Sequence, residues 1–196
     1  MDKRTPRPWR QVRQGQEYDF TILRVREDSY ADPRDGSLHG RVLLTAPDWV
    51  NVVALTPKGE ALLVRQFRFG VQANTLEIPG GMVDAGESPA AAAARELAEE
   101  TGFQAGSWRL LGAVHPNPAL QKNMCHTYLA LDCQRLAASP PQTDEDIEVV
   151  RVPAESLERL VQQGAITHAL VVNAVYFAAR AGVLTLPLKP SRTDGV

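Results

Sequence analysis

The sequence is poor in cysteine and carries almost no net charge. Cys125 and Cys133 are its only cysteines, and on one straight strand they would stand roughly 26 Å apart, whereas a disulfide needs roughly 4–7 Å between its Cα atoms. They match no metal-binding or redox spacing, so we expect two free thiols. The formal charge of −2 supplies no basic excess to neutralise phosphates, which argues against a nucleic-acid partner.

Long apolar runs are also absent. No segment approaches the about 18 apolar residues that a membrane-spanning helix needs, and the N-terminal MDKRTPRPWR lacks the apolar core of a signal peptide. We therefore expect no membrane partner and a cytoplasmic location. The length of 196 residues suits one domain, or one domain with a small extension.

The order of the expected elements predicts an α/β fold with a mixed sheet. Alternating apolar and polar residues at 19–28 and the run at 39–47 predict a β hairpin. This hairpin and the N-terminal tail define a β subdomain at 1–47, followed by a main domain at 48–188 and a disordered tail at 189–196. The other elements expected in the main domain are strands at 51–57, 61–69, 75–78, 108–114 and 125–133, a long and therefore functional loop at 115–124, and helices at 154–163 and 167–180.

A further helix is predicted between Ser88 and Gly102. The Ser88 hydroxyl can cap free backbone N–H groups, and Pro89 fits the first helical position, where a missing donor costs nothing. Gly102 can end the helix in the left-handed conformation. The face expected to pack against the sheet consists of Ala90, Ala93, Ala94, Leu97 and Thr101.

Three carboxylates crowd one face of this helix. Glu96, Glu99 and Glu100 stand at i, i+3 and i+4, a spacing at which like charges cost a helix roughly 0.2–0.5 kcal/mol. A divalent cation would offset that cost, and hard oxygen ligands suit Mg²⁺, or Mn²⁺, rather than zinc. Upstream, Gly80 and Gly81 have no Cβ, so their backbone can approach a ligand closely.

These residues carry a resemblance to a known family. Gly81, five residues, Glu87, seven residues and then RELAEETGF at 95–103 resemble the Nudix box of the Nudix hydrolases. The runs APDWVNVVALT, LLVRQFRFG and TLEIPGG resemble the ADP-ribose and nucleoside-diphosphate-sugar pyrophosphatase branch. The resemblance implies an α/β/α sandwich with an N-terminal β subdomain that is often exchanged within a homodimer. It also implies a nucleotide-sugar substrate.

The resemblance further implies a metal site and its ligands. Glu96, Glu99 and Glu100 would bind Mg²⁺ or Mn²⁺ together with the Gly80 carbonyl. A fifth ligand, Glu145, would come from the acidic EDIEV segment, which matches the loop that brings a glutamate to the metals in related pyrophosphatases. The alternative for that segment is a solvated acidic turn.

Catalytic roles are implied for Glu87, Arg95, Glu99 and Glu145. Arg95 would pair with Glu87 and hold the glycine loop against the helix, although an ordinary i, i+4 pair with Glu99 is an alternative. Glu145, or another acid of the 144–148 segment, is the candidate general base for the attacking water.

Substrate contacts are expected from a few residues outside the box. Arg65 and Arg68 could bind phosphate through their guanidinium groups, and a structural ion pair is the alternative for each. Tyr30 could stack on a base, although an aromatic side chain is also a common core residue.

One departure from the branch concerns specificity. Members dedicated to ADP-ribose tend to carry a Pro-Gly step in the loop after the box, whereas this sequence has PNPA at 116–119. GDP-mannose and other sugar nucleotides therefore remain candidate substrates. Two other functions remain open: hydrolysis of nucleoside triphosphates or dinucleoside polyphosphates, and nucleotide sensing without turnover.

Overall fold

The computed structural model describes residues 5–136 and 146–184, and its contacts divide the chain into two units. Unit 1 comprises Met1–Pro47 and His115–Met124. Unit 2 comprises Asp48–Val114 and Cys125–Val196. Segment 115–124, expected in the main domain, therefore belongs to the smaller unit, because its backbone bonds to the last strand of that unit. The predicted tail at 189–196 lies outside the described residues.

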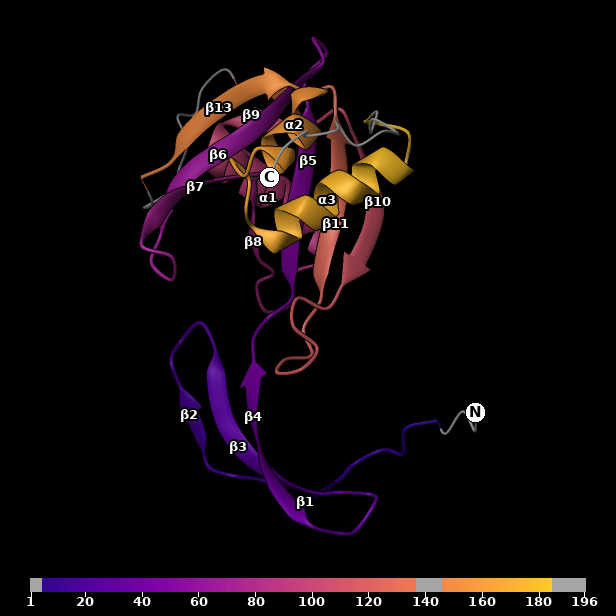
Figure 1. The fold of residues 1–196 in the computed structure, drawn as a ribbon. Helices are drawn as coiled ribbons and strands as arrows, with labels where there is room; N and C mark the ends of the chain where they lie inside the picture. Colours follow the sequence, from indigo (N-terminus) through magenta and orange to yellow (C-terminus); the bar gives the residue numbers. More distant parts are fainter. Residues whose placement is uncertain (1–4, 137–145, 185–196) are drawn as a thin grey trace. The chain divides into compact units, whose positions relative to one another are not determined.

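Unit 2 is built on a mixed seven-stranded sheet, as predicted (Figure 1). The strand order is β10-β11-β5-β6-β13, with β8 beside β5 and β7 beside β6. β11 runs parallel to β5, and the other pairs are antiparallel. The strands are β5 (Trp49–Leu55), β6 (Glu60–Arg68), β7 (Ala73–Glu77), β8 (Gly80–Met82), β10 (Ser107–Val114), β11 (Cys125–Leu131) and β13 (Glu148–Pro153).

The two central strands of this sheet pair at one end only. β5 and β6 meet at Ala54↔Leu62 and Leu55↔Ala61 and then diverge. β7 and β8 pair with β6 and β5 respectively where those two strands have separated. This arrangement carries the glycine segment at Gly80 into the middle of the sheet.

Helices cover both faces of the sheet. Because neighbouring residues of a strand point to opposite faces, Val52 of β5 packs against Leu97 of α1 (Pro89–Thr101), whereas Val53 packs in a cluster with Val171 of α3 (Ala169–Arg180). Figure 1 shows α3 lying across β5 and β11. α2 (Ser156–Gln162) adds the buried Leu157 to the same face as α3.

Unit 1 is a four-stranded antiparallel sheet. Its central strand β3 pairs with β4 along one edge and with β1 and β2 along the other, and the predicted hairpin is β3–β4. Segment 115–124 joins it through hydrogen bonds from Leu44 N–H to Leu120 O and from Asn123 Nδ2 to Pro47 O. The strands are β1 (Arg10–Arg13), β2 (Glu17–Asp19), β3 (Arg24–Ala31) and β4 (Leu38–Thr45). A small pair, β9 (Phe103–Gln104) and β12 (Gln134–Arg135), completes the strands described in unit 2.

Two predicted strands are shorter than expected, each because of a backbone with positive φ. Thr21, with φ 70°, interrupts the predicted run at 19–28, so β3 begins only at Arg24. Asp132, with φ 55°, ends β11 before Cys133. Both cysteines are nonetheless free, as predicted, and both are buried. Within the described part of the chain, no helix is long and apolar enough to cross a membrane.

Candidate active site

Helix α1 begins and ends where its sequence predicts. Ser88 Oγ accepts a hydrogen bond from Ala91 N–H at 3.2 Å, Pro89 opens the helix, and Gly102 ends it with φ 71°. The expected sheet-facing set was wrong at Ala90 and Ala94, which are exposed. The buried positions of the helix are Ala92, Ala93, Leu97, Glu100 and Thr101.

The glycine segment is fixed to β5 by its backbone. Val52 N–H donates to Pro79 O at 2.8 Å, and Gly80 stands opposite Asn51. Because hydrogen bonding alternates along an antiparallel pair, Gly80 directs its own N–H away from β5, where it donates to Glu100 Oε2 at 3.0 Å. In a strand the carbonyl of a residue points to the same side as its N–H. The Gly80 carbonyl therefore lies on the side of the Glu100 carboxylate.

Arg95 joins the helix to the glycine segment, and its predicted pairing with Glu87 is present. Its Nε and Nη2 donate to the two oxygens of Glu87 at 3.2 and 3.0 Å, and Nη2 also donates to Met82 O at 2.9 Å. Its Nη1 donates to Glu96 at 2.9 Å and to Glu99 at 3.0 Å. The alternative i, i+4 contact with Glu99 thus coexists with the pairing to Glu87.

Burial and hydrogen bonding set the charges of this cluster. Hydrogen bonds from Arg95 lower the pKa of Glu87, and the same network raises the pKa of Arg95, so that pair stays charged. Burial raises the pKa of Glu96 even though Arg95 and its hydrogen bond oppose that rise. A nearby positive charge would therefore stabilise the ionised form of Glu96.

The donor set fits a hard divalent cation in chemistry. Glu96 and Glu99 share one donor atom of Arg95, so their oxygens already lie close to a common point, and Glu100 faces the Gly80 backbone. All these donors are oxygens, which Mg²⁺ and Mn²⁺ prefer. Among the residues that the structure describes, no three His, Cys, Asp or Glu side chains converge on one point.

Comparison with known proteins establishes the family. The NUDIX domain model matches residues 46–174. This chain belongs to the Nudix family. It is 31% identical over 144 residues to the ADP-ribose pyrophosphatase of Bacillus subtilis (strain 168), covering 73% of this chain and 78% of that protein. It is 32% identical over 117 residues to the GDP-mannose pyrophosphatase of Citrobacter koseri, covering 56% and 61% of the two chains.

A solved structure shares the Nudix fold of this chain. It is titled as an ADP compounds hydrolase, and it superposes with a TM-score of 0.80 over 91% of this chain and 96% of its own, at 20% identity. The predicted combination of a mixed sheet, flanking helices and an N-terminal antiparallel sheet is thereby confirmed.

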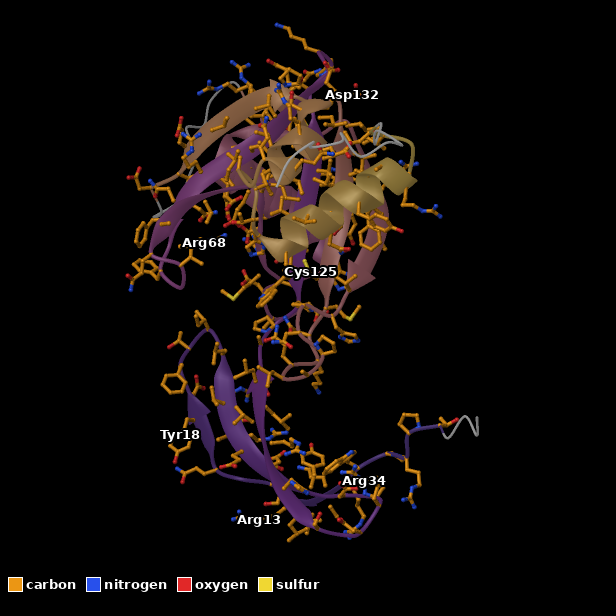
Figure 2. The ribbon with its side chains drawn as sticks, in the orientation of Figure 1. Arg13, Tyr18, Arg34, Arg68, Cys125 and Asp132 are labelled. Atoms are coloured by element: carbon orange, nitrogen blue, oxygen red, sulfur yellow. The ribbon has the colours of Figure 1, made fainter. Side chains whose placement is uncertain are left out.

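The two predicted phosphate-binding arginines of this Nudix chain both have carboxylate partners. Arg68, labelled in Figure 2, donates through Nε and Nη2 to the two oxygens of Glu77, each at 2.9 Å. Burial alone would raise the pKa of Glu77, but hydrogen bonds from Arg68 and Thr75 outweigh it and lower that pKa. Arg65 donates to Glu148 of β13 at 2.7 Å.

Tyr30 belongs to unit 1, where it lines a cavity of about 530 Å³. The side of this cavity formed by the sheet includes Arg24 and Arg26, both paired with Glu17. The other side is formed by residues 118–122 of segment 115–124. A function of this loop stays a prediction. Glu145, the predicted fifth metal ligand and base, lies outside the described residues.

The sequence-based selection omitted Asn51, which stands opposite Gly80 and is 9% exposed. The available signal was one amide in the otherwise apolar run VNVVAL. Apolar strands tolerate a buried amide only at a free-energy cost.

Proposed function

We propose that this Nudix enzyme hydrolyses the pyrophosphate bond of nucleoside diphosphate sugars. Water attacks one phosphorus, the bridging P–O bond breaks, and a nucleoside monophosphate and a sugar phosphate leave. The observation that carries the proposal is the clamp of Gly80 against Glu100, beside Glu96 and Glu99, in a complete Nudix box. The names of the relatives, ADP-ribose and GDP-mannose pyrophosphatase, support the sugar-nucleotide class.

Mg²⁺ is the proposed metal, with Mn²⁺ as a substitute. When bound, it neutralises phosphate oxygens and lowers the pKa of a coordinated water. The metal would be held by Glu96, Glu99, Glu100 and the Gly80 carbonyl, because the three carboxylates stand on α1 and Glu100 contacts Gly80 of β8. Glu145 is proposed to join them and to accept the proton of the attacking water.

Arg95 and Glu87 are proposed to shape the site without touching the reacting atoms. Their two hydrogen bonds tie residues before the helix to its middle, and the third bond of Arg95 fixes Met82 O. Arg65 and Arg68 are proposed to draw the diphosphate by charge, because each keeps an exposed side-chain fraction of at least 40% beside its carboxylate partner. Tyr30 is proposed to stack on the base through its aromatic ring.

A homodimer is proposed as the working form. Unit 1 exposes four large apolar side chains on β1 and the β2–β3 region, and a second copy would remove them from water. They are Val12, Tyr18, Phe20 and Ile22, with exposed fractions of 45%, 56%, 61% and 59%. Light scattering of the purified protein tests this: a monomer at micromolar concentration would contradict it.

The deciding experiment is a substrate panel with Mg²⁺ and with EDTA. We expect phosphate-ester release from ADP-ribose, GDP-mannose or UDP-glucose with Mg²⁺ and none with EDTA. Turnover of dGTP or of a dinucleoside polyphosphate alone would overturn the sugar-nucleotide assignment. Binding without turnover would point to a nucleotide sensor.

A further inference from the structure

Gly80 and Gly81 of β8 have no Cβ, and this lets neighbouring residues approach β8 closely on opposite faces of the sheet. A Cβ at Gly81 would clash with Glu96 Oε1, on the side of α1. A Cβ at Gly80 would clash with Val50 O and would lie 2.9 Å from Asn51 Oδ1. Neither glycine has a positive φ in the described structure, so both are required by close approach rather than by backbone conformation. Glu96 and Asn51 therefore lie close to β8, one on each of its faces.

Asn51 is fixed where it contacts β8. It belongs to β5, which pairs with β11 on its other edge, so Asn51 stands in one row with Gly80 and Thr127. The residues that follow it, Val52 and Val53, are 0% exposed. The backbone of Asn51 therefore cannot move away from β8 without disrupting the pairing of β5 at the centre of the sheet.

The amide of Asn51 has no explanation in the packing of the fold. Its Nδ2 is buried and has no hydrogen-bond partner among the described residues. Such a donor costs desolvation free energy that a valine at the same position would not. An amide retained at such a cost opposite Gly80 is a feature expected of a functional site rather than of a core.

We propose that Asn51 is a positioning residue for Gly80, holding the Gly80 peptide against Glu100 so that its carbonyl faces the metal site. Asn51 Oδ1 lies 2.9 Å from the place where a Cβ of residue 80 would stand, and Glu100 Oε2 accepts the Gly80 N–H. The inference rests on the proposed function, because it assigns Asn51 a role toward the metal that the enzyme would use.

The test is Mn²⁺ binding to the full chain without substrate, measured as the decrease in the EPR signal of free Mn²⁺. We expect Asn51→Leu to weaken Mn²⁺ binding by about tenfold, the size typical for groups that orient metal ligands. Asn173→Leu is the matched control, because Asn173 Nδ2 is another buried amide nitrogen without a partner among the described residues, placed on α3. Asn173→Leu should leave the Mn²⁺ affinity within about twofold of the wild type.

A second measurement separates positioning from general stability. Hydrogen exchange of the Gly80 amide should accelerate in Asn51→Leu, whereas amides of β11 keep their wild-type rates. Asn51→Ser carries the same two measurements if the leucine variant fails to fold. Unchanged Mn²⁺ affinity in the variant, or equal weakening in Asn173→Leu, overturns the inference and leaves the proposed function intact. A wild-type protein that binds no Mn²⁺ at millimolar concentration overturns the proposed function itself.

Discussion

The two units of this chain bury different chemistry. Unit 2 encloses two apolar clusters, one on each face of its sheet. Among the described residues of unit 1, the buried ones are Ala31 and three polar side chains, Asp28, Asp32 and Asn123. Apolar burial is the main favourable term in folding, so unit 2 carries its own stability. Unit 1 is held together mainly by hydrogen bonds, so we expect it to be less stable than unit 2.

The difference also affects how rigidly each unit holds its side chains. The carboxylates of α1 stand on a helix anchored by Leu97, which is 0% exposed, and rigid elements hold catalytic groups more accurately than loops do. The cavity of unit 1 is lined by segment 115–124 and by strands with few buried apolar residues. Local stability is expected to be lower there.

The largest expected effect comes from removing the charge of Glu100 in unit 2. Glu100→Gln keeps an oxygen that can accept the Gly80 N–H but removes one negative charge from the proposed metal site, so turnover should fall by orders of magnitude. Steady-state kinetics with a Mg²⁺ titration measure this. The control is Glu155→Gln at the exposed residue that precedes α2, which should not change turnover. Near-normal activity of Glu100→Gln would refute the metal assignment.

Next in size is a break in the apolar core of unit 2. Leu97→Ala should lower the free energy of unfolding by about 2–5 kcal/mol, because it removes buried methyl groups and leaves a cavity. Urea unfolding followed by circular dichroism measures the loss. Leu110→Ala, at a position 53% exposed, should cost less than about 1 kcal/mol. Equal losses in the two variants would show that α1 does not anchor the unit.

The polar interior of unit 1 predicts a smaller and more local loss. Asp28 accepts hydrogen bonds from Gln11 Nε2, Gly15 N–H and Arg26 Nε at 2.9–3.1 Å. Asp28→Asn should weaken them by about 1.5–3 kcal/mol in total. We expect faster exchange of the Gly15 amide and easier tryptic cleavage at Arg13, with amide exchange in unit 2 unchanged. Asp19→Asn is the control, since Asp19 is exposed. Cooperative loosening of both units would contradict the contrast between them.

The smallest effect concerns the buried ion pair of unit 2. Glu77→Gln should cost about 1 kcal/mol at pH 7, because Arg68 is partly exposed and solvent screens the pair. Folding lowers the pKa of Glu77 below its ordinary value of 4.5. Its contribution is therefore fully present above the unfolded-state pKa and is lost as pH falls through the folded-state pKa. The stability difference between wild type and variant should shrink below about pH 4.5, as chemical unfolding at several pH values would show.

The exposed ion pair of the same sheet provides the control for that variant. Glu148→Gln breaks the contact with Arg65, in which both side chains are at least 45% exposed. Such a pair contributes little, so the variant should unfold with the wild type at every pH. A pH-dependent loss in Glu148→Gln as large as that in Glu77→Gln would mean that burial does not distinguish the two pairs.

Local chemistry made part of this structure predictable. The ends of α1 follow from Ser88, Pro89 and Gly102, each of which acts through its own backbone or hydroxyl. The buried face of the same helix was wrong at Ala90 and Ala94, because an unbroken run of alanines has no apolar contrast to mark a face.

Long-range pairing accounts for what the sequence could not predict. Arg68 meets Glu77 only through the register of β6 with β7, which pairs Arg68 with Ala73 and Val64 with Glu77. Asn51 gained significance only when β8 was placed against it. Neither contact has a sequence signature, because both depend on which strand lies next to which.

The assignment of segment 115–124 to unit 1 has a practical consequence for dissecting the protein. The polypeptide passes between the units three times, after Pro47, Val114 and Met124. A chain shortened to begin at Asp48 would keep Leu120 but lose Leu44, whose N–H occupies the Leu120 carbonyl. Deleting the N-terminal strands therefore does not isolate unit 2; it leaves a ten-residue insertion without the strand that pairs with it.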